Sequence, residues 1–191
     1  RYNLICYKYA PRLAAATCWG IRDADSCNPV ATFVATSAQQ SLLGRSSFQA
    51  ESRFAPGARA YLYDDGEGRT VAAVWTFDTS LDYGRAAGET MTLGWTGSDI
   101  EVFDMMGNRA EAKADGGALR LPLSNFPFYL RVPAAKGDAL LEAINSCEMT
   151  GRQDVSLGFD VKPLSLKKIR VTVVNPLSRA FKGSLSFFGN A

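Results

Sequence analysis

Hydrophobic residues follow two different periods along this chain, and the period changes at Gly44. From Pro29 to Leu43, the run "PVATFVATSAQQSLL" places apolar residues near helical spacing. Asn28 can cap the start of a helix, Pro29 fits its first turn, and Gly44 follows the last apolar residue. The pattern therefore predicts one amphipathic helix that stops at Gly44.

After Gly44 the period becomes two, which is typical of β-strands. The stretch "RAYLYDDGEGRTVAAVWTF" predicts a hairpin, because Tyr61 and Tyr63 alternate before the turn "DDGEG" and apolar residues alternate after it. The stretches "ETMTLGW", "IEVFDMMGN", "ALRLPL" and "PFYLRV" predict further strands at short, regular spacing. Such spacing is typical of a sandwich or barrel. The expected fold class is all-β, an antiparallel β-sandwich with one short N-terminal helix.

The same pattern divides the chain into segments. Residues 1–44 are expected to form an N-terminal segment whose helix packs on the sandwich, and residues 45–135 to form the sandwich itself. Residues 136–151 are expected to be a linker or a short helix. Residues 152–191 return to β periodicity and either complete the sandwich or open a second one. The strands expected there are Val155–Val161, Ile169–Val174 and Gly183–Phe188.

Composition removes several classes of function. The chain has 191 residues and a formal net charge of +2, with charged residues scattered along its length. A nucleic-acid-binding protein carries a clustered basic surface instead, and no apolar run here is long enough to span a membrane. The chain also contains no histidine, which excludes Ser-His-Asp and Cys-His nucleophiles and the commonest zinc ligand. We therefore expect neither nucleic acid nor a membrane as a partner.

The four cysteines leave the redox state open. Cys6, Cys18, Cys27 and Cys147 lack the CxxC spacing of a zinc site. Their even number permits disulfides, and Cys18 and Cys27 would close the easiest loop, but buried free thiols fit the spacing equally well.

Carboxylates gather in two places, and glycoside hydrolysis needs two carboxyl groups at a suitable separation. The two groups are Asp64, Asp65 and Glu67, and then Asp99, Glu101 and Asp104. Aspartate before Gly66 is a favourable turn residue, and Glu101 is expected to point outward beside Val102. We therefore interpret both groups as structural. Oxygen ligands at the turn "DDGEG" would suit calcium, but the turn lacks the full ligand spacing of a known calcium loop, so no cofactor is expected.

A second turn signal lies at Asp104 and the pair Gly107-Asn108. Aspartate accepts local backbone N–H groups, and glycine and asparagine tolerate a left-handed backbone. Pro127 confines the following strand to a sheet edge or to a strand start. We interpret residues 102–132 as sandwich scaffold and not as a site.

These residues also carry a resemblance to a known family. The stretch "ARAYLYDDGEGRTVAAVW" followed by "IEVFDMMGNRAEAKADGGALRLPLSNFPFYLRV" is similar to the accessory β-sandwich of bacterial multidomain glycoside hydrolases. The residues that match its turn and closing strand are Asp104, Gly107, Asn108, Pro127, Tyr129 and Leu130. Upstream, "CWGIRDAD" and the predicted helix resemble the last strand and helix of a (β/α)8 glycosidase barrel. The final "IRVTVVNPLSRAFKGSLSF" resembles the opening of a further accessory sandwich.

The resemblance implies a non-catalytic module, because no motif in this sequence matches those that hold the paired catalytic glutamates of such barrels. It implies an accessory, carbohydrate-binding role in a polysaccharide-degrading enzyme that is secreted or periplasmic. The expected partners are a polysaccharide or oligosaccharide and a catalytic glycosidase domain, and the chain itself is expected not to be an enzyme. A second hypothesis is a purely structural sandwich that packs against a catalytic glycosidase domain without binding glycan. A third is a small carboxylate-dependent glycoside hydrolase.

Carbohydrate binding by such a module relies on flat side chains that stack on sugar rings. Trp75 ends an apolar strand and is expected in the core. Trp95 lies between two glycines, and Tyr83 has Asp82 and Arg85 as hydrogen-bonding neighbours. The predicted carbohydrate-binding residues are therefore Trp95, Tyr83, Asp82 and Arg85, although a β-sandwich also buries large aromatic side chains routinely.

Overall fold

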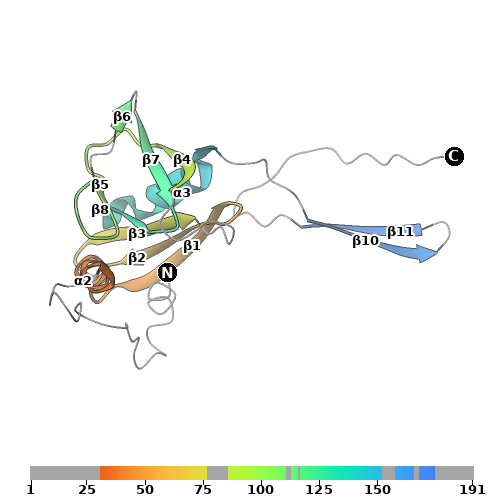
Figure 1. Ribbon diagram of the computed structural model, residues 1–191, viewed down its shortest axis with the longest axis horizontal. Coiled ribbons are helices and arrows are strands. Elements are labelled where there is room, and N and C mark those ends of the chain that lie inside the picture. The colour runs from red at the N-terminus through yellow and green to blue at the C-terminus, as the bar shows by residue number, and fades with distance from the viewer. Residues whose placement is uncertain are drawn as a thin grey trace.

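The computed structural model describes residues 31–76, 86–110, 113–115, 117–151, 158–165 and 168–174. These residues form mostly antiparallel β-strands, accompanied by two short α-helices (Figure 1). The all-β expectation is confirmed in this broad sense. The described part of the chain nevertheless holds a second α-helix beside the single one named in the expected fold class. Residues 1–30 and the strand expected at Gly183–Phe188 lie outside the described residues.

The helix that the sequence predicts is α2 (Ala31–Leu43). It is followed by Gly44, whose backbone N–H donates to the Gln40 carbonyl at 2.7 Å and whose φ is +43°. Glycine adopts this left-handed conformation without the penalty that a Cβ brings. The helix therefore ends where its sequence signal ends, and the chain turns into the first strand.

The larger sheet has the strand order β1-β2-β3-β8-β5. Its strands are β1 (Ser47–Ala55), β2 (Ala58–Asp64), β3 (Arg69–Thr76), β8 (Phe128–Pro133) and β5 (Glu101–Phe103). The predicted hairpin is β2 and β3, in which Tyr63 pairs with Val71. The strand predicted in "PFYLRV" is β8, which lies between β3 and β5 rather than at an edge. Pro127 directly precedes it, so the strand-start alternative is the correct one.

The smaller sheet has the strand order β6-β7-β4-β9. Its strands are β6 (Lys113–Asp115), β7 (Ala118–Ser124), β4 (Ala86–Gly94) and β9 (Glu148–Thr150). Between β8 and β9 lie the 3₁₀ turn η2 (Ala134–Lys136) and the helix α3 (Gly137–Ser146). The segment 136–151, for which the sequence left a linker or a helix open, is therefore a helix followed by a short strand.

The last two described strands, β10 (Gly158–Ser165) and β11 (Lys168–Val174), pair with each other in a separate two-stranded sheet (Figure 1). Their register sets Phe159 opposite Val173 and Val161 opposite Val171. The expectation that residues 152–191 complete the first sandwich or open another stays a prediction.

The main core lies between the two large sheets. It joins Leu62 and Val74 of the five-stranded sheet with Leu93 and Leu121 of the four-stranded sheet. These side chains are almost completely buried, and burial alternates along β7 with the period of two that its sequence predicts. α3 contacts β1 of one sheet and β4 of the other, and its Leu140 enters the same core.

A second apolar cluster lies on the opposite face of the five-stranded sheet. β3 is buried along nearly its whole length, because Ala72 belongs to the main core and Ala73 to the second cluster. Leu42 and Leu43 of α2 belong to this second cluster, together with Trp75. Trp75 is 4% exposed, so its expected place in the core is confirmed. The five-stranded sheet is therefore covered on both faces, and α2 is one of the covers.

We predict that replacing Leu43 with alanine lowers the free energy of unfolding by about 2–5 kcal/mol, because the side chain is fully buried. Urea denaturation followed by tryptophan fluorescence measures this change. Gln40→Ala, at an exposed position of the same helix, is the matched control and should change the value by less than about 0.5 kcal/mol. Equal stabilities of Leu43→Ala and the native chain would mean that α2 does not stabilise the sheet.

Candidate functional site

The face of the five-stranded sheet that α2 covers carries aromatic residues at its centre and charged residues at its margin. The register sets Arg131 of β8 opposite Val71 of β3 and opposite Glu101 of β5. Arg69 lies two residues before Val71 on the same strand. Because paired residues share a face, as do residues two apart, these three charged residues lie on the face of the second apolar cluster. Charges at such a place need partners, since an unpaired charge is costly to desolvate.

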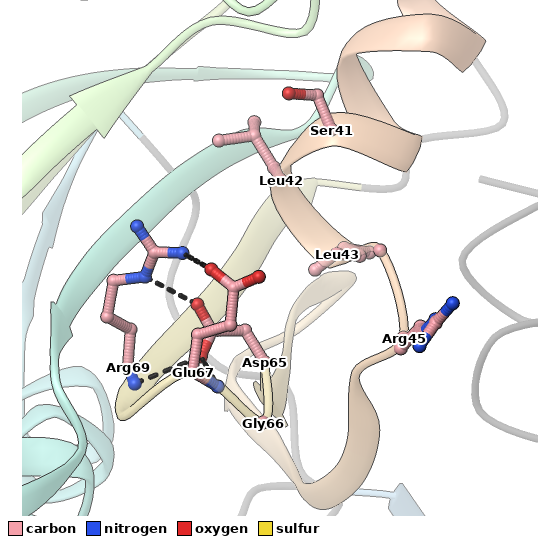
Figure 2. A pocket seen from close by; sticks show the side chains of 9 residues that line it. Ser41, Leu42, Leu43, Arg45, Asp65, Gly66, Glu67 and Arg69 are labelled. Atoms are coloured by element: carbon pink, nitrogen blue, oxygen red, sulfur yellow. Dashed lines mark hydrogen bonds and ion pairs between the residues drawn. The ribbon is translucent and has the colours of Figure 1, made fainter.

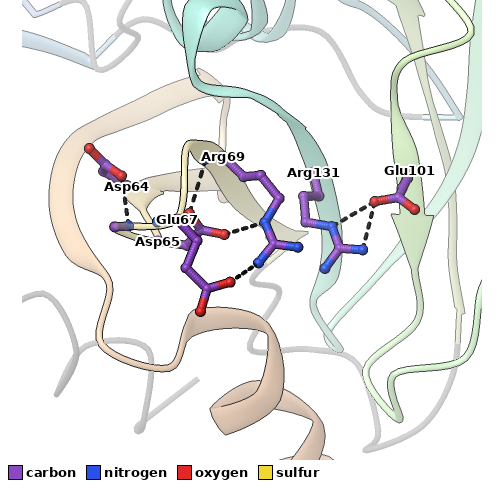
Figure 3. Close-up of polar contacts among 7 residues, drawn as sticks. Asp64, Asp65, Glu67, Arg69, Glu101 and Arg131 are labelled. Atoms are coloured by element: carbon purple, nitrogen blue, oxygen red, sulfur yellow. Dashed lines mark hydrogen bonds and ion pairs between the residues drawn. The ribbon is translucent and has the colours of Figure 1, made fainter.

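Arg69 pairs with two carboxylates of the turn between β2 and β3. Asp65 Oδ1 accepts the backbone N–H groups of Glu67 at 2.8 Å and of Arg69 at 3.0 Å, and Asp65 Oδ2 accepts Arg69 Nε at 2.6 Å. Arg69 Nη2 also donates to the Glu67 carboxylate (Figure 3). Aspartate therefore shapes this turn as the sequence predicts, and it also fixes the guanidinium group of Arg69.

Glu101 holds two further arginines. Its Oε2 accepts Arg131 Nε and Nη2, both at 2.6 Å, and its Oε1 accepts Arg109 Nη2. The Arg131 guanidinium also lies 4.8 Å from the centre of the Phe103 ring, within the range of a cation–π contact. Figure 3 shows that the side chains of Arg69 and Arg131 extend into the same region from neighbouring strands.

The two carboxylates that fix these arginines are more acidic than usual. For Glu101 the hydrogen bond from Arg131 lowers the pKa, and burial opposes it. For Asp65 burial raises the pKa, but the hydrogen bonds from Glu67 and Arg69 outweigh it, so that the net pKa lies below its usual value. Both groups are therefore ionised at neutral pH. Neither can act as the proton donor that glycoside hydrolysis requires, because that role needs a raised pKa.

Two pockets open between α2 and this face of the sheet. The turn pocket lies beside the β2–β3 turn and has a volume of about 460 Å³, and the aromatic pocket lies beside β5 and has a volume of about 420 Å³. Residues that line the turn pocket include Ser41, Leu42, Asp65, Glu67 and Arg69 (Figure 2). Residues that line the aromatic pocket include Phe33, Ser37, Ser41, Leu42, Phe103 and Arg131. Because Ser41 and Leu42 line both, the two pockets are neighbours along the helix.

The predicted turn at Asp104 is confirmed and has a second use. Asp104 Oδ1 accepts the backbone N–H groups of Met106 at 2.8 Å and Asn108 at 2.9 Å, and Gly107 has a φ of +83°. A Cβ on Gly107 would lie 3.0 Å from the Ala38 Cβ of α2, so glycine also permits the close approach of the helix. Met106 and Gly107 line the aromatic pocket. The stretch interpreted only as scaffold therefore also contributes to a pocket.

Of the predicted carbohydrate-binding residues, Trp95 is described. It is partly buried against the main core, its indole N–H donates to Asp99 Oδ1 at 3.2 Å, and Lys136 Nζ lies 6.0 Å from its ring centre. Lys136 also pairs with Asp99, and the hydrogen bond from Lys136 lowers the pKa of that carboxyl group. The other members of the set lie outside the described residues: Tyr83, Asp82 and Arg85. The role of the set in sugar binding stays a prediction.

The other aromatic and acidic candidates have partners within the chain. Tyr61 and Trp75 are both buried and make a T-shaped contact with ring centres 4.9 Å apart. Asp64 Oδ1 accepts the Gly66 N–H within the turn. Within the described ranges, no group of three or more His, Cys, Asp or Glu residues is placed to hold a metal ion. The expectation of no cofactor, with calcium at the turn "DDGEG" as the less favoured alternative, stays a prediction. The carboxylates of Asp65 and Glu67 are directed to Arg69.

No helix among the described residues is both long enough and apolar enough to cross a membrane.

The arginines around the pockets were not anticipated from the sequence. Their signal is nevertheless present, because Arg69 and Arg131 occupy positions of β3 and β8 that alternate with main-core residues such as Leu130. A charged residue at such a position indicates either a partner or a cavity beside the sheet.

Comparisons with known proteins give a partial match. No family model matches the chain, and no curated protein matches it. A solved structure of a family 39 glycoside hydrolase from the gut symbiont Bacteroides cellulosilyticus WH2 is similar, with a TM-score of 0.46 and 26% sequence identity. The match covers 59% of this chain and 22% of the other, so this chain spans less than a quarter of the length of the protein that it matches.

This match contradicts the prediction that the chain is not an enzyme, because the matched protein is a glycoside hydrolase. The prediction rested on the lack of a catalytic motif. A stretch without such a motif can nevertheless be part of an enzyme's chain, and we therefore withdraw the prediction. What remains of the family resemblance is a likeness to part of a glycoside hydrolase, not to a carbohydrate-binding module in particular.

We predict that Glu101→Gln lowers the free energy of unfolding at neutral pH by about 1–2 kcal/mol, since two arginines lose their carboxylate. The pKa of Glu101 is lowered from 4.5 on folding, so its stabilisation is complete above pH 4.5 and is lost as the pH falls through the folded value. Urea denaturation between pH 7 and pH 2.5 should therefore show a shallower acid loss in Glu101→Gln than in the native chain.

The control for this experiment is Glu142→Gln, which changes an exposed carboxylate of α3. Parallel pH curves for the native chain and Glu101→Gln would contradict the assignment of Glu101 as the anchor of the two arginines.

Proposed function

We propose that this chain is the β-sandwich part of a glycoside hydrolase and that it supports the catalytic part of that enzyme. The proposal starts from the resemblance carried by the Asp104 turn and the Tyr129-Leu130 strand. It takes glycoside hydrolysis as the activity of the whole protein, and residues 45–135 as the sandwich, to which β9 adds a strand.

The packing between the sheets supports a sandwich. Apolar residues from β2 and β3 on one side and from β4 and β7 on the other belong to one core cluster. A sandwich is a pair of antiparallel sheets whose inner faces interdigitate in this way.

The observation that carries the proposal is the position of α2. This helix belongs to the segment that resembles the edge of a (β/α)8 barrel, and its Leu42 and Leu43 join the buried aromatic cluster of the sheet. A helix fixed in this manner is packed with the sheet as one unit. Because the central aromatic residues Tyr61, Tyr63 and Trp75 are buried, they support a core rather than a sugar-stacking surface.

The remaining parts of the proposal concern surroundings and partners. We propose a secreted or periplasmic enzyme that acts on an oligosaccharide or polysaccharide. We also keep the set Trp95, Tyr83, Asp82 and Arg85 as a proposed second contact with glycan, tested below beside the pockets.

The proposal is tested by immunodepletion from the organism that makes this protein. Antibodies raised against the 191-residue chain are used to deplete both cell extract and culture fluid, and hydrolysis of a panel of 4-nitrophenyl glycosides is measured before and after. We expect depletion to remove most of the activity toward at least one glycoside.

The matched control is the same antibody saturated with recombinant chain, which should leave the activity in place. If the antibody removes its target protein completely, as judged by immunoblotting, while every hydrolytic activity stays unchanged, the proposed function is wrong.

A further inference from the structure

The turn pocket and the aromatic pocket together form an open surface between α2 and the sheet. Each has a volume within the range of about 300–1,000 Å³ that is usual for small-molecule sites. α2 lines one side of both pockets, and its Leu42 belongs to the second apolar cluster. The other side consists of the turns after β2 and β5 together with the strand residues Arg69, Phe103 and Arg131. The wall that α2 forms is held more precisely than the walls that the turns form.

The walls offer hydrogen-bond donors that the described residues do not engage. The partners of Arg69 engage its Nε and Nη2 atoms, and those of Arg131 engage the same two atoms. In the described part of the chain, the Nη1 amino groups of both arginines therefore remain available. Figure 3 shows these groups pointing toward the space between the two side chains. Ser41 adds a hydroxyl group from the helix, at the boundary of the two pockets.

Most charged residues around these pockets are paired with one another. Arg69 pairs with Asp65 and Glu67, while Arg109 and Arg131 pair with Glu101, which gives three cations and three carboxylates. Figure 2 shows Arg45, the further cation of the turn pocket, directed away from Arg69. An anionic ligand would have to compete with carboxylates already in place. A neutral ligand with many hydroxyl groups can instead accept from the arginines and donate to Glu67, whose side chain is 73% exposed.

The aromatic pocket adds an apolar wall. Phe33 is the large apolar side chain that is exposed in the described part of the chain, at 38%. It lines the aromatic pocket opposite Phe103 and Met106, which belong to the sheet side. A flat apolar side chain beside hydroxyl groups and guanidinium donors provides the two kinds of contact that a sugar ring needs, with its C–H face on the ring and its hydroxyl groups on the polar atoms.

We propose that the turn pocket and the aromatic pocket together bind a short neutral oligosaccharide. In the aromatic pocket, Phe33 stacks on one sugar ring and Arg131 donates to a hydroxyl group. In the turn pocket, Arg69 donates to a hydroxyl group of another ring and Glu67 accepts from one. The choice of a sugar rests on the proposed function, whereas the choice of a neutral one rests on the pairing of Arg69 and Arg131 with carboxylates. The site does not include Trp95, which packs against the main core.

The test is titration of the full 191-residue chain with neutral tetrasaccharides, followed by isothermal calorimetry. The probes are xylotetraose, cellotetraose, mannotetraose and laminaritetraose, and tetragalacturonate is the acidic probe. Ser41→Phe fills the shared wall of both pockets, and Phe33→Ala removes the stacking side chain. We expect at least one neutral probe to bind, with affinity about tenfold or more weaker in Ser41→Phe and about two- to tenfold weaker in Phe33→Ala.

Gln40→Phe is the matched control, because it adds the same side chain at the next exposed position of α2 and Gln40 lines neither pocket. It should bind like the native chain. Thermal unfolding of every variant is measured first. If Ser41→Phe does not fold, Glu67→Gln at the exposed turn takes its place, with the same expected direction.

Each other outcome overturns the proposal. Failure of every neutral probe at millimolar concentration removes it, and binding of tetragalacturonate alone removes the neutral assignment. Binding that is lost in Trp95→Ala but kept in Ser41→Phe moves the site to the Trp95 set. Immunodepletion tests the proposed function separately, on the native enzyme. If the chain binds no probe but the antibody removes a hydrolytic activity, the sugar-binding proposal is wrong and the proposed function stands.

Discussion

The structure depends on the burial of both faces of one sheet. β3 contributes Ala72 to the main core and Ala73 to the second cluster, and neither face of such a strand can be left to water without loss of the apolar contacts that hold it. The second face is completed by Leu42 and Leu43, each worth about 1.5–3 kcal/mol when buried. The C-terminal end of α2 is therefore as much a part of the fold as any strand.

The charged margin follows from the same constraint. α2 covers the centre of the face and leaves its rim open. Apolar residues at the rim would expose an apolar patch to water. Charged residues there need partners, because an unpaired charge is costly to desolvate. Asp65 meets this requirement locally, four residues before Arg69, through one turn. Glu101 meets it at long range, thirty residues before Arg131. The pockets lie where the helical cover ends and this ionic rim begins.

Local chemistry explains which parts could be predicted. The helix stop at Gly44, the β2–β3 hairpin and the Asp104 turn depend on neighbouring residues, and each lies where the sequence places it. The pairing of β3 with β8 depends on residues far apart, and turn chemistry carries no information about it. This is why the start of the closing strand could be predicted from Pro127. Its position inside the sheet and the pairing of Arg131 with Glu101 could not be predicted from the sequence. The same limit explains why the prediction that the chain is not an enzyme was wrong. The lack of a catalytic motif in one stretch gives no information about the longer chain to which that stretch can belong.

The two proposed sugar contacts differ in how the fold constrains them. Trp95 gives its indole N–H to Asp99 and packs on the main core, so sugar binding there would compete with contacts that the chain already makes. At the pockets, Phe33 is exposed and the Nη1 groups of two arginines point between their side chains, held there by carboxylates that stay ionised at neutral pH. A ligand at the pockets meets donors whose orientation is already set, and less ordering on binding means more of the contact energy appears as affinity. The carboxylates that hold Arg69 and Arg131 in the fold therefore also orient them for binding a ligand.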